Sequence, residues 1–251
     1  EVSLPSGELL RTSAPGFTIE RDRFDRALAS AAQEAGAEII TSACATEIAG
    51  DAVRATINGK AFTFRGRVII GAEGPLSLVA ESMGMRRSRF ALGFQERLPL
   101  TRRLHRASIY YDHRYVGGYA WVFPRGPEAN VGLALDEGRS KELPALYLDF
   151  KWKLLKTGIV SSEKPLFKTC GLIPVTGMAE KLQAGHFLLA GDAAGVTHPL
   201  TGAGIAAAVI SGRLAGELAA QSLKTGDMSL LASYDEECAL TFTHERAMAI
   251  K

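Results

Sequence analysis

The chain has 251 residues, of which 47% are hydrophobic and 22% charged, and its formal net charge is +2. This length allows one large domain or two interleaved ones, and the composition is ordinary for a soluble protein. The small net charge gives no reason to expect a nucleic-acid partner, and we expect none.

The three cysteines, Cys44, Cys170 and Cys238, lie far apart in the sequence. Their spacing matches neither a metal site nor a disulfide framework. We therefore expect no metal and a reducing compartment, the cytoplasm. The chain opens without a signal peptide and has no apolar run of membrane-spanning length, so any membrane contact would be peripheral.

The first part of the chain predicts alternating helices and strands. Residues 21–36 (RDRFDRALASAAQEAG) place apolar side chains on one helical face and end in a glycine, which predicts a helix. Short alternating runs predict strands, and Gly50-Asp51 and Asn58-Gly59 are typical hairpin turns. The expected strands are residues 37–40, 43–48, 52–57, 61–64 and 67–71. A helix is expected around residues 77–83.

From about residue 90 to residue 175 the pattern becomes rich in strands. The expected strands are residues 91–97, 107–111, 118–123, 130–135 and 167–174. One amphipathic helix, residues 143–156, interrupts them. The long alanine-rich helix that ends near residue 223 and a last helix over residues 229–250 complete the prediction.

The segment 191–208, GDAAGVTHPLTGAGIAAA, directly follows the short apolar run 187–190. Such a run predicts a buried strand, and open α/β sheets bind ligands at the carboxyl ends of their strands. The glycines allow close backbone approach, and a helix that starts near Ile205 would direct free N–H groups at a bound group. This pattern favours a dinucleotide, and a flavin best. Residues 202–207 also match G-x-G-x-x-A, but they lie too far past the strand to be that fingerprint.

Three stretches, in this order and spacing, resemble the flavoprotein group that contains p-hydroxybenzoate hydroxylase-type enzymes and geranylgeranyl reductases. They are R-x-x-F-D-x-x-L from Arg21 with the Gly-Ala-Glu at 36–38, the GAEGP-x-S segment at 71–77, and AGDAAG at 190–195 with the loop that follows it. The second carries Glu73 where the group usually has aspartate. In the middle of the chain, GGYAWVFP at 117–124 looks like the Y-x-W-x-F-P segment of the geranylgeranyl reductase family.

The resemblance implies FAD as the cofactor and assigns roles to individual residues. Asp192 is expected to bind flavin hydroxyls, and Gly202, Ala203 and Gly204 to offer backbone N–H groups to the ring, in a loop that includes Gly191 and is shaped by Pro199. Arg21 and the backbone near Ala45 are expected to lie near the adenosine half of FAD. His198 is the candidate proton donor, with a loop residue that bonds its own backbone as the alternative; Cys170 is a second candidate, with plain packing as its alternative.

Tyr119, Trp121 and Phe123 alternate and so project from one face of a strand. An aromatic wall of this kind suits an isoprenoid chain or a flavin face, although it is also what the buried side of a sheet looks like. We interpret the three as lining the substrate channel. A basic cluster has two interpretations, a solvated face or a surface for an anionic substrate or a membrane headgroup. It comprises Arg86, Arg87, Arg89, Arg97, Arg102, Arg103 and Arg106.

The resemblance predicts a mixed α/β chain: an FAD/NAD(P)-binding three-layer domain with an inserted antiparallel sheet that binds substrate. The expected boundaries are 1–89 and 179–251 for the FAD-binding domain and 90–178 for the substrate domain. Residues 1–40 lack the group's G-x-G-x-x-G loop, so we expect a fragment of a longer flavoprotein.

The expected activity is reduction of carbon–carbon double bonds in a prenyl chain, on a prenylated lipid or pigment, with NADPH or a ferredoxin as electron donor. Two alternatives stay open. The first is an FAD-dependent monooxygenase that acts on an aromatic or polyketide ring. The second is a flavin-free fragment that binds lipid.

Overall fold

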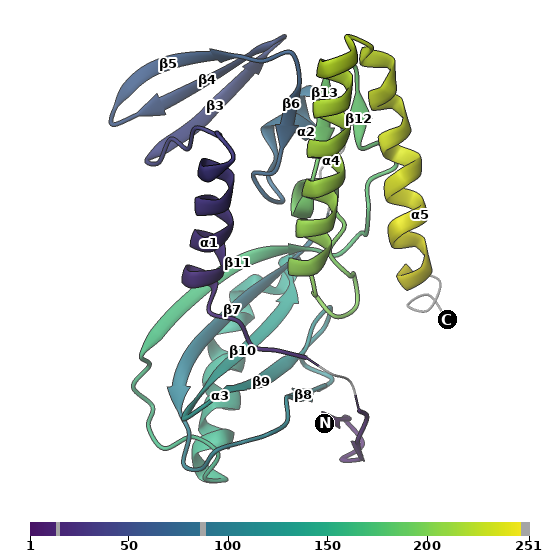
Figure 1. Cartoon of the computed structure of the whole chain (residues 1–251). Helices are drawn as coiled ribbons and strands as arrows, with labels where there is room; N and C mark the ends of the chain where they lie inside the picture. The colour runs from purple at the N-terminus through teal and green to yellow at the C-terminus, as the bar shows by residue number, and fades with distance from the viewer. Residues whose placement is uncertain (14–15, 86–88, 247–251) are drawn as a thin grey trace. The chain divides into compact units, whose positions relative to one another are not determined.

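A computed structural model describes residues 1–13, 16–85 and 89–246 of the chain, which form two compact units (Figure 1). One unit comprises residues 1–39 and 91–172, and the other comprises residues 40–90 and 173–251. The sequence-based boundaries placed residues 1–39 with the FAD-binding segments. The first strand, β1 (Val2–Ser3), instead pairs in parallel with β8 (Ser108–Tyr110), which joins the start of the chain to the middle segment. The roles of the predicted domains stay predictions.

The first unit is built on a seven-stranded sheet in the order β11-β7-β10-β9-β8-β1-β2. Its other strands are β2 (Leu9–Leu10), β7 (Phe90–Pro99), β9 (Ala120–Arg125), β10 (Glu128–Asp136) and β11 (Phe167–Pro174). The central strands β7, β10, β9 and β8 pair antiparallel. This confirms the strand-rich middle segment. Strand β11 has the predicted bounds, and the other four strands differ from their predicted ranges by a few residues.

Helix α3 (Leu143–Lys156) packs on one face of this sheet and has the predicted bounds (Figure 1). A short 3-10 helix, η1 (Glu137–Glu142), leads into it. Tyr147, Phe150 and Leu154 of α3 are buried against Val122 and Val131 of the sheet. Because side chains alternate along a strand, the face opposite α3 carries Trp121 and its neighbours at every second position.

Helix α1 (Arg21–Glu34) forms as predicted, but no residue in it is buried. Its apolar face therefore contributes little burial energy within the described residues, and Leu28 remains 48% exposed. The strand predicted at residues 37–40 is wrong, because these exposed residues have no strand partner among the described residues. A short apolar run forms a strand only where an adjacent edge can satisfy its N–H and C=O groups.

The second unit contains two three-stranded sheets, β3-β4-β5 and β12-β13-β6. The strands are β3 (Ala43–Ala49), β4 (Ala52–Ile57), β5 (Lys60–Arg65), β6 (Ile69–Gly71), β12 (Gln183–Ala184) and β13 (Phe187–Leu189). The first sheet is the predicted meander. Asn58 (φ 49°) and Gly59 (φ 78°) form its second hairpin turn with the positive φ angles that this turn requires.

Strands β6 and β13 pair in parallel and are packed by helices α2 (Leu78–Ser82), α4 (Ile205–Thr225) and α5 (Tyr234–Arg246) (Figure 1). The 3-10 helices η2 (Gly191–Ala194) and η3 (Met228–Ser233) complete the unit. Tyr234, Cys238 and Phe242 recur at helical spacing and form the buried face of α5. In the register, Leu189 lies opposite Gly71, so the loops after β6 and β13 start side by side at one edge.

Candidate functional site

The loop after β13 is held to helix α4 from its first residue. The backbone N–H of Gly191 donates to the hydroxyl of Ser211 at 2.9 Å, and the hydroxyl of Tyr234 donates to the carbonyl of Leu189 at 2.7 Å. Ser211 and Tyr234 are both fully buried. The end of β13 is therefore fastened to two helices, which makes the start of the loop rigid.

Asp192 lies just after this anchor and is oriented by the loop itself. The hydroxyl of Thr197, which is 3% exposed, donates a short hydrogen bond to the Asp192 carboxylate. The carboxylate has further acceptor sites, and the Asp192 side chain is partly exposed. Asp192 is thus placed to accept hydrogen bonds from the hydroxyls of a ligand.

The glycines at the end of the loop leave space that a side chain would fill. A Cβ at Gly204 would collide with the Thr197 hydroxyl and lie 3.4 Å from the Asp192 carboxylate. Gly202 has a φ of 67°, in the left-handed region that favours glycine. Gly202 and Ala203 are exposed, and Gly204 caps the 21-residue helix α4 without a side-chain hydrogen bond. The N–H of Gly202 donates to the His198 carbonyl at 2.9 Å, whereas the start of α4 has no side-chain cap.

His198 is bonded within the loop. Its backbone N–H donates to Ala203, and its Nδ1 accepts hydrogen bonds from the backbone N–H groups of Leu200 at 3.3 Å and Thr201 at 3.2 Å. These contacts require an unprotonated Nδ1, so a ring protonated at both nitrogens would lose them. The geometry therefore favours the interpretation in which His198 bonds the backbone and shapes the loop that contains Pro199.

The neighbouring loop after β6 carries the glutamate that stands where the resembling group has aspartate. Glu73 Oε1 accepts hydrogen bonds from the hydroxyl of Ser77 at 2.8 Å and from the N–H of Val79 at 3.0 Å. Ser77 in turn caps α2 by accepting from Ala80 at 3.0 Å. Glu73 thus stabilises the N-terminus of α2, where a negative charge is favourable.

The remaining predicted cofactor residues lie on other elements. Ala45 is exposed on β3, where the pairing with β4 shifts register between Ala45 and Glu47. Arg21 opens α1 in the other compact unit and forms an ion pair with Asp25 at 2.9 Å. Predicted site residues therefore fall into both units, with Ala45 and the loop 191–204 in one and Arg21 and the aromatic residues in the other.

The predicted aromatic residues form a continuous row on the sheet face opposite α3. Ring centroids are 5.9 Å apart between Tyr119 and Trp121 and 6.1 Å apart between Trp121 and Phe123. Tyr111, which the sequence analysis missed, extends the row at 5.8 Å from Tyr119. Trp121 is 9% exposed, and burial raises the pKa of Tyr119 to about 12. The row is thus a largely apolar surface on which the Tyr119 phenol stays neutral.

Gly132 makes room for the central ring of this row. It lies opposite Trp121 across the β9–β10 pair, and a Cβ there would collide with the indole ring and lie 2.8 Å from Cβ of Gln95. The indole N–H donates to the Gln95 side chain at 3.2 Å. Gly132, Gln95, Thr197 and Ser211 are functional candidates that sequence reasoning missed. Their contacts depend on strand register and helix packing, which one sequence does not display.

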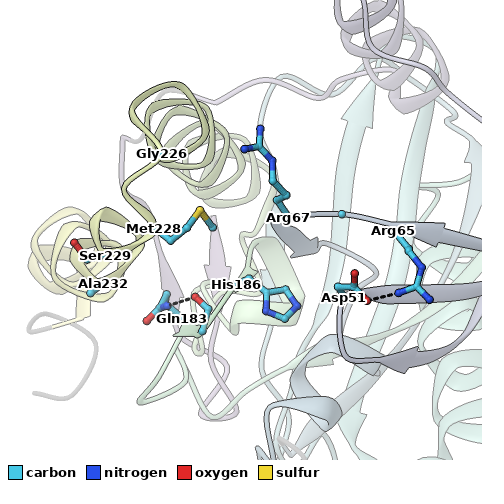
Figure 2. Close-up of a pocket in the computed structure, with 11 residues that line it drawn as sticks. Asp51, Arg65, Arg67, Gln183, His186, Gly226, Met228, Ser229 and Ala232 are labelled. Carbon is cyan, nitrogen blue, oxygen red and sulfur yellow. Dashed lines mark hydrogen bonds and ion pairs between the residues drawn. The ribbon is translucent and has the colours of Figure 1, made fainter.

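A separate open pocket of about 850 Å³ lies at the opposite end of β13, beside the turn that precedes it (Figure 2). His186 lines it and donates from Nε2 to the carbonyl of Gly50 at 3.2 Å, and Arg65 pairs with Asp51 at 2.5 Å. No predicted site residue lines this pocket. The two ends of β13 thus differ, with predicted cofactor residues only at its carboxyl end.

Other predictions can be compared with the described residues. Cys170 is exposed on β11, and both of its interpretations stay predictions. Within residues 1–13, 16–85 and 89–246, no group of His, Cys, Asp and Glu side chains could hold a metal ion. None of the helices in these ranges combines the length and apolarity needed to cross a membrane. Arg86 and Arg87 of the basic cluster lie outside the described residues.

The loop 191–204 fits a flavin in its chemistry, because it offers a carboxylate for hydroxyl groups, an uncapped helix start and glycines that leave space. The family described as FAD binding domain matches residues 171–245, which include this whole loop and helix α4. The chain is therefore an FAD-binding flavoprotein, and FAD is its cofactor.

The chain is 33% identical to digeranylgeranylglycerophospholipid reductase 1 of Methanopyrus kandleri, over 99% of this chain and 71% of that protein. It belongs to the geranylgeranyl reductase family. It is also 35% identical to the digeranylgeranylglycerophospholipid reductase of Methanocella arvoryzae, over 88% of this chain and 59% of that protein. The chain thus spans about 60% of the length of this relative.

Among solved structures, a geranylgeranyl bacteriochlorophyll reductase-like protein from Thermoplasma acidophilum is similar, with a TM-score of 0.81 and 22% identity. The similarity covers 96% of this chain and 66% of that one, and it shows a shared fold. The predicted mixed α/β flavoprotein fold is confirmed.

Proposed function

We propose that this chain is the flavin- and substrate-binding part of an enzyme that reduces carbon–carbon double bonds in the prenyl chains of a lipid. The observation that carries the proposal is its identity of 33–35% to digeranylgeranylglycerophospholipid reductases over most of its length. Bound and reduced FAD supplies hydride for such a reduction. The residues of this chain bind the flavin, orient the prenyl chain and shield the reacting groups from water.

In this proposal Asp192, oriented by Thr197, binds hydroxyl groups of the flavin side chain. The backbone N–H groups of Gly202, Ala203 and Gly204 are assigned to the polar edge of the ring, beside the uncapped start of α4. The N–H of Gly202 donates to the His198 carbonyl at 2.9 Å and that of Ala203 to the Thr201 hydroxyl at 3.4 Å, so these two groups would exchange their loop hydrogen bonds for the ring. Gly191 and Pro199 fix the path of the loop. Arg21 and the backbone near Ala45 are assigned to the adenosine half.

The aromatic row is assigned to the prenyl chain. The surface formed by Tyr119, Trp121 and Phe123 is largely excluded from water. An isoprenoid chain that lies against it is stabilised, because apolar area is removed from water. A neutral Tyr119, whose pKa burial raises to about 12, adds no charge to this surface. Exclusion of water at this surface keeps bulk solvent away from the reacting double bond.

Proton donation by His198 is part of the proposal and has a direct test. Because Nδ1 accepts two backbone hydrogen bonds, an asparagine side-chain oxygen can replace it in shaping the loop but cannot deliver a proton. If His198 donates the proton, His198→Asn and His198→Ala both lose turnover. If it only shapes the loop, His198→Asn retains turnover and His198→Ala loses it together with FAD affinity.

The donor of electrons is proposed to be NADPH or a ferredoxin.

The cysteines Cys44, Cys170 and Cys238 are free thiols, as suits a reducing compartment, and we place the enzyme in the cytoplasm. A lipid substrate requires peripheral contact with a membrane or a lipid carrier.

The decisive experiment supplies the FAD-loaded protein with dithionite and an unsaturated prenyl lipid under anaerobic conditions, and measures the lipid by mass spectrometry. The expected product has gained two hydrogens per double bond. A product that forms only with oxygen and carries an added oxygen atom would assign the monooxygenase alternative. Binding of the lipid by a protein that takes up no FAD would assign the lipid-binding alternative.

A further inference from the structure

The pocket of about 850 Å³ beside the turn before β13, here named the His186 pocket, has no role in the proposed function (Figure 2). Its volume is typical of small-molecule sites in proteins. Three segments of one compact unit line it: Asp51 with residues 65–67, the turn 183–186, and the link 226–232 after helix α4. None of the residues assigned to the flavin or to the prenyl chain is among them.

Hydrogen bonds hold the walls of the His186 pocket together. The backbone N–H of Gly66 donates to the Asp51 carbonyl at 3.0 Å. The backbone N–H of Ile69, at the start of β6, donates to the His186 carbonyl at 3.0 Å. The His186 ring donates from Nε2 to the carbonyl of Gly50 at 3.2 Å. Because these bonds join the turn before β13 to the turn between β3 and β4, a ligand meets a preorganised site.

The charged side chains of the pocket leave one arginine available to a ligand. Asp51 pairs with Arg65 at 2.5 Å, so these two charges compensate each other. Arg67 also lines the pocket, is exposed, and has no hydrogen bond or ion pair with any described residue. A planar guanidinium donates two parallel hydrogen bonds to a carboxylate. The pocket therefore has the donors and the single uncompensated charge that suit a monovalent carboxylate.

The wall that follows helix α4 is apolar. Met228 and Ala232 line it, and the fully buried side chain of Leu231 fixes their segment to the core of the unit. A methionine side chain is flexible and polarisable, so it adapts to the shape of a flat apolar group. This wall thus suits an apolar body attached to the carboxylate rather than a free inorganic ion.

The end of helix α4 determines which way such a ligand lies. Gly226 ends the helix and lines the pocket, and a helix C-terminus carries partial negative charge. A carboxylate is therefore disfavoured beside Gly226 and favoured beside Arg67. Figure 2 shows Arg67 and Met228 on different walls of the pocket. One ligand can thus direct its charge to Arg67 and its apolar body to Met228.

We propose that the His186 pocket binds a small monocarboxylate with a flat apolar body. Arg67 holds the carboxylate, and Met228 and Ala232 contact the body. The site is separate from the flavin site, because the pocket precedes β13 and the loop 191–204 follows that strand. The carboxylate therefore binds together with FAD and not in its place.

The test compares naphthoate with naphthamide, two probes of nearly the same shape that differ in charge. Binding to the FAD-loaded protein is measured by isothermal titration calorimetry at low salt, where screening is weak. We expect naphthoate to bind about fivefold more tightly, as for one exposed ion pair with two hydrogen bonds. In Arg67→Gln the affinity for naphthoate drops to that for naphthamide, whereas the affinity for naphthamide stays unchanged.

Ala232→Phe tests the apolar wall. Because Ala232 is exposed, the larger ring enters the pocket and not the core, and circular dichroism should show an unchanged fold. Both probes should lose binding in this variant. Unchanged binding of both probes by a folded Ala232→Phe protein would place them outside the His186 pocket and overturn the inference.

Arg54→Gln is the matched control, because Arg54 is an exposed arginine of the same unit that pairs with Glu47 and does not line the pocket. It should keep the full preference for naphthoate. Equal binding of the two probes by the unaltered protein, failure of both to bind, or a preference that persists in Arg67→Gln overturns the inference. Release of FAD by naphthoate also overturns it, because the probe would then occupy the flavin loop.

Discussion

Thr197 donates a hydrogen bond to the Asp192 carboxylate from a position that is almost completely buried. Because the two residues lie in one loop, this bond fixes the direction of the carboxylate before any ligand binds. A preorganised acceptor loses less side-chain freedom on binding than a free one does. The loop after β13 is thus shaped for its ligand by its own side chains.

Thr197→Val should weaken FAD binding by about tenfold, because the carboxylate loses a donor and its fixed direction. The dissociation constant is measured by titration of flavin fluorescence. Thr197→Ser keeps the hydroxyl and should bind FAD nearly as the unaltered protein does. Equal affinities in the valine and serine variants would show that this bond does not position Asp192.

Gly204→Ala should destabilise the protein and lower its FAD affinity, since the added methyl group displaces the Thr197 hydroxyl. We expect a loss of about 2 kcal/mol in the free energy of unfolding, as for an overpacked site. The measurement is urea denaturation followed by circular dichroism.

Gly212→Ala is the control for this substitution. Gly212 lies within helix α4, and a Cβ there meets nothing within 4 Å. Alanine is the better helix former, so this variant should gain about 1 kcal/mol. A loss at Gly212 equal to that at Gly204 would mean that the effect comes from the helix and not from the crowded loop.

Gly132→Ala should move the Trp121 indole and break its hydrogen bond with Gln95. We expect a red shift of tryptophan fluorescence and a loss of about 2 kcal/mol in unfolding free energy. Gly171→Ala, on β11 of the same sheet, is the control because a Cβ there meets nothing within 4 Å. An unchanged emission spectrum in Gly132→Ala would contradict the assigned crowding.

Glu96 and Lys151 form a buried ion pair at 2.6 Å that joins β7 to α3. Burial alone would raise the pKa of Glu96, but the hydrogen bond and charge of Lys151 outweigh it, and its pKa lies below its usual 4.5. The pair therefore stabilises the fold above pH 4.5. This contribution is lost as the pH falls through the lower pKa of the folded state.

Glu96→Gln should cost about 3 kcal/mol at pH 7, because it leaves Lys151 buried without its partner. The double variant Glu96→Gln/Lys151→Met should recover part of this loss. Chemical denaturation from pH 7 to pH 3 measures both effects, and the unaltered protein should approach the single variant at the acid end. An equal loss in Glu96→Gln at pH 3 and pH 7 would contradict the pair's role.

Much of the candidate cofactor site could be predicted from the sequence, because its residues are contiguous. The loop 191–204 combines an acid, glycines and a helix start within one short segment, so local spacing already determines which groups lie together. The helix at residues 143–156 and the strand at residues 167–174 were likewise predicted with their observed bounds, since their periodic patterns suit the partners that they find. The basic cluster was visible in the sequence, and its two interpretations stay open.

Tertiary structure decided the contacts between residues far apart in the chain. Strand register puts Gly132 opposite Trp121 across the β9–β10 pair. Helix packing brings Lys151 to Glu96 and Tyr234 to Leu189. Residues 37–40 are irregular because none of the strands among the described residues pairs with them. Hydrophobic periodicity states which face of an element is apolar, whereas the choice of partner depends on the burial and pairing of the whole unit.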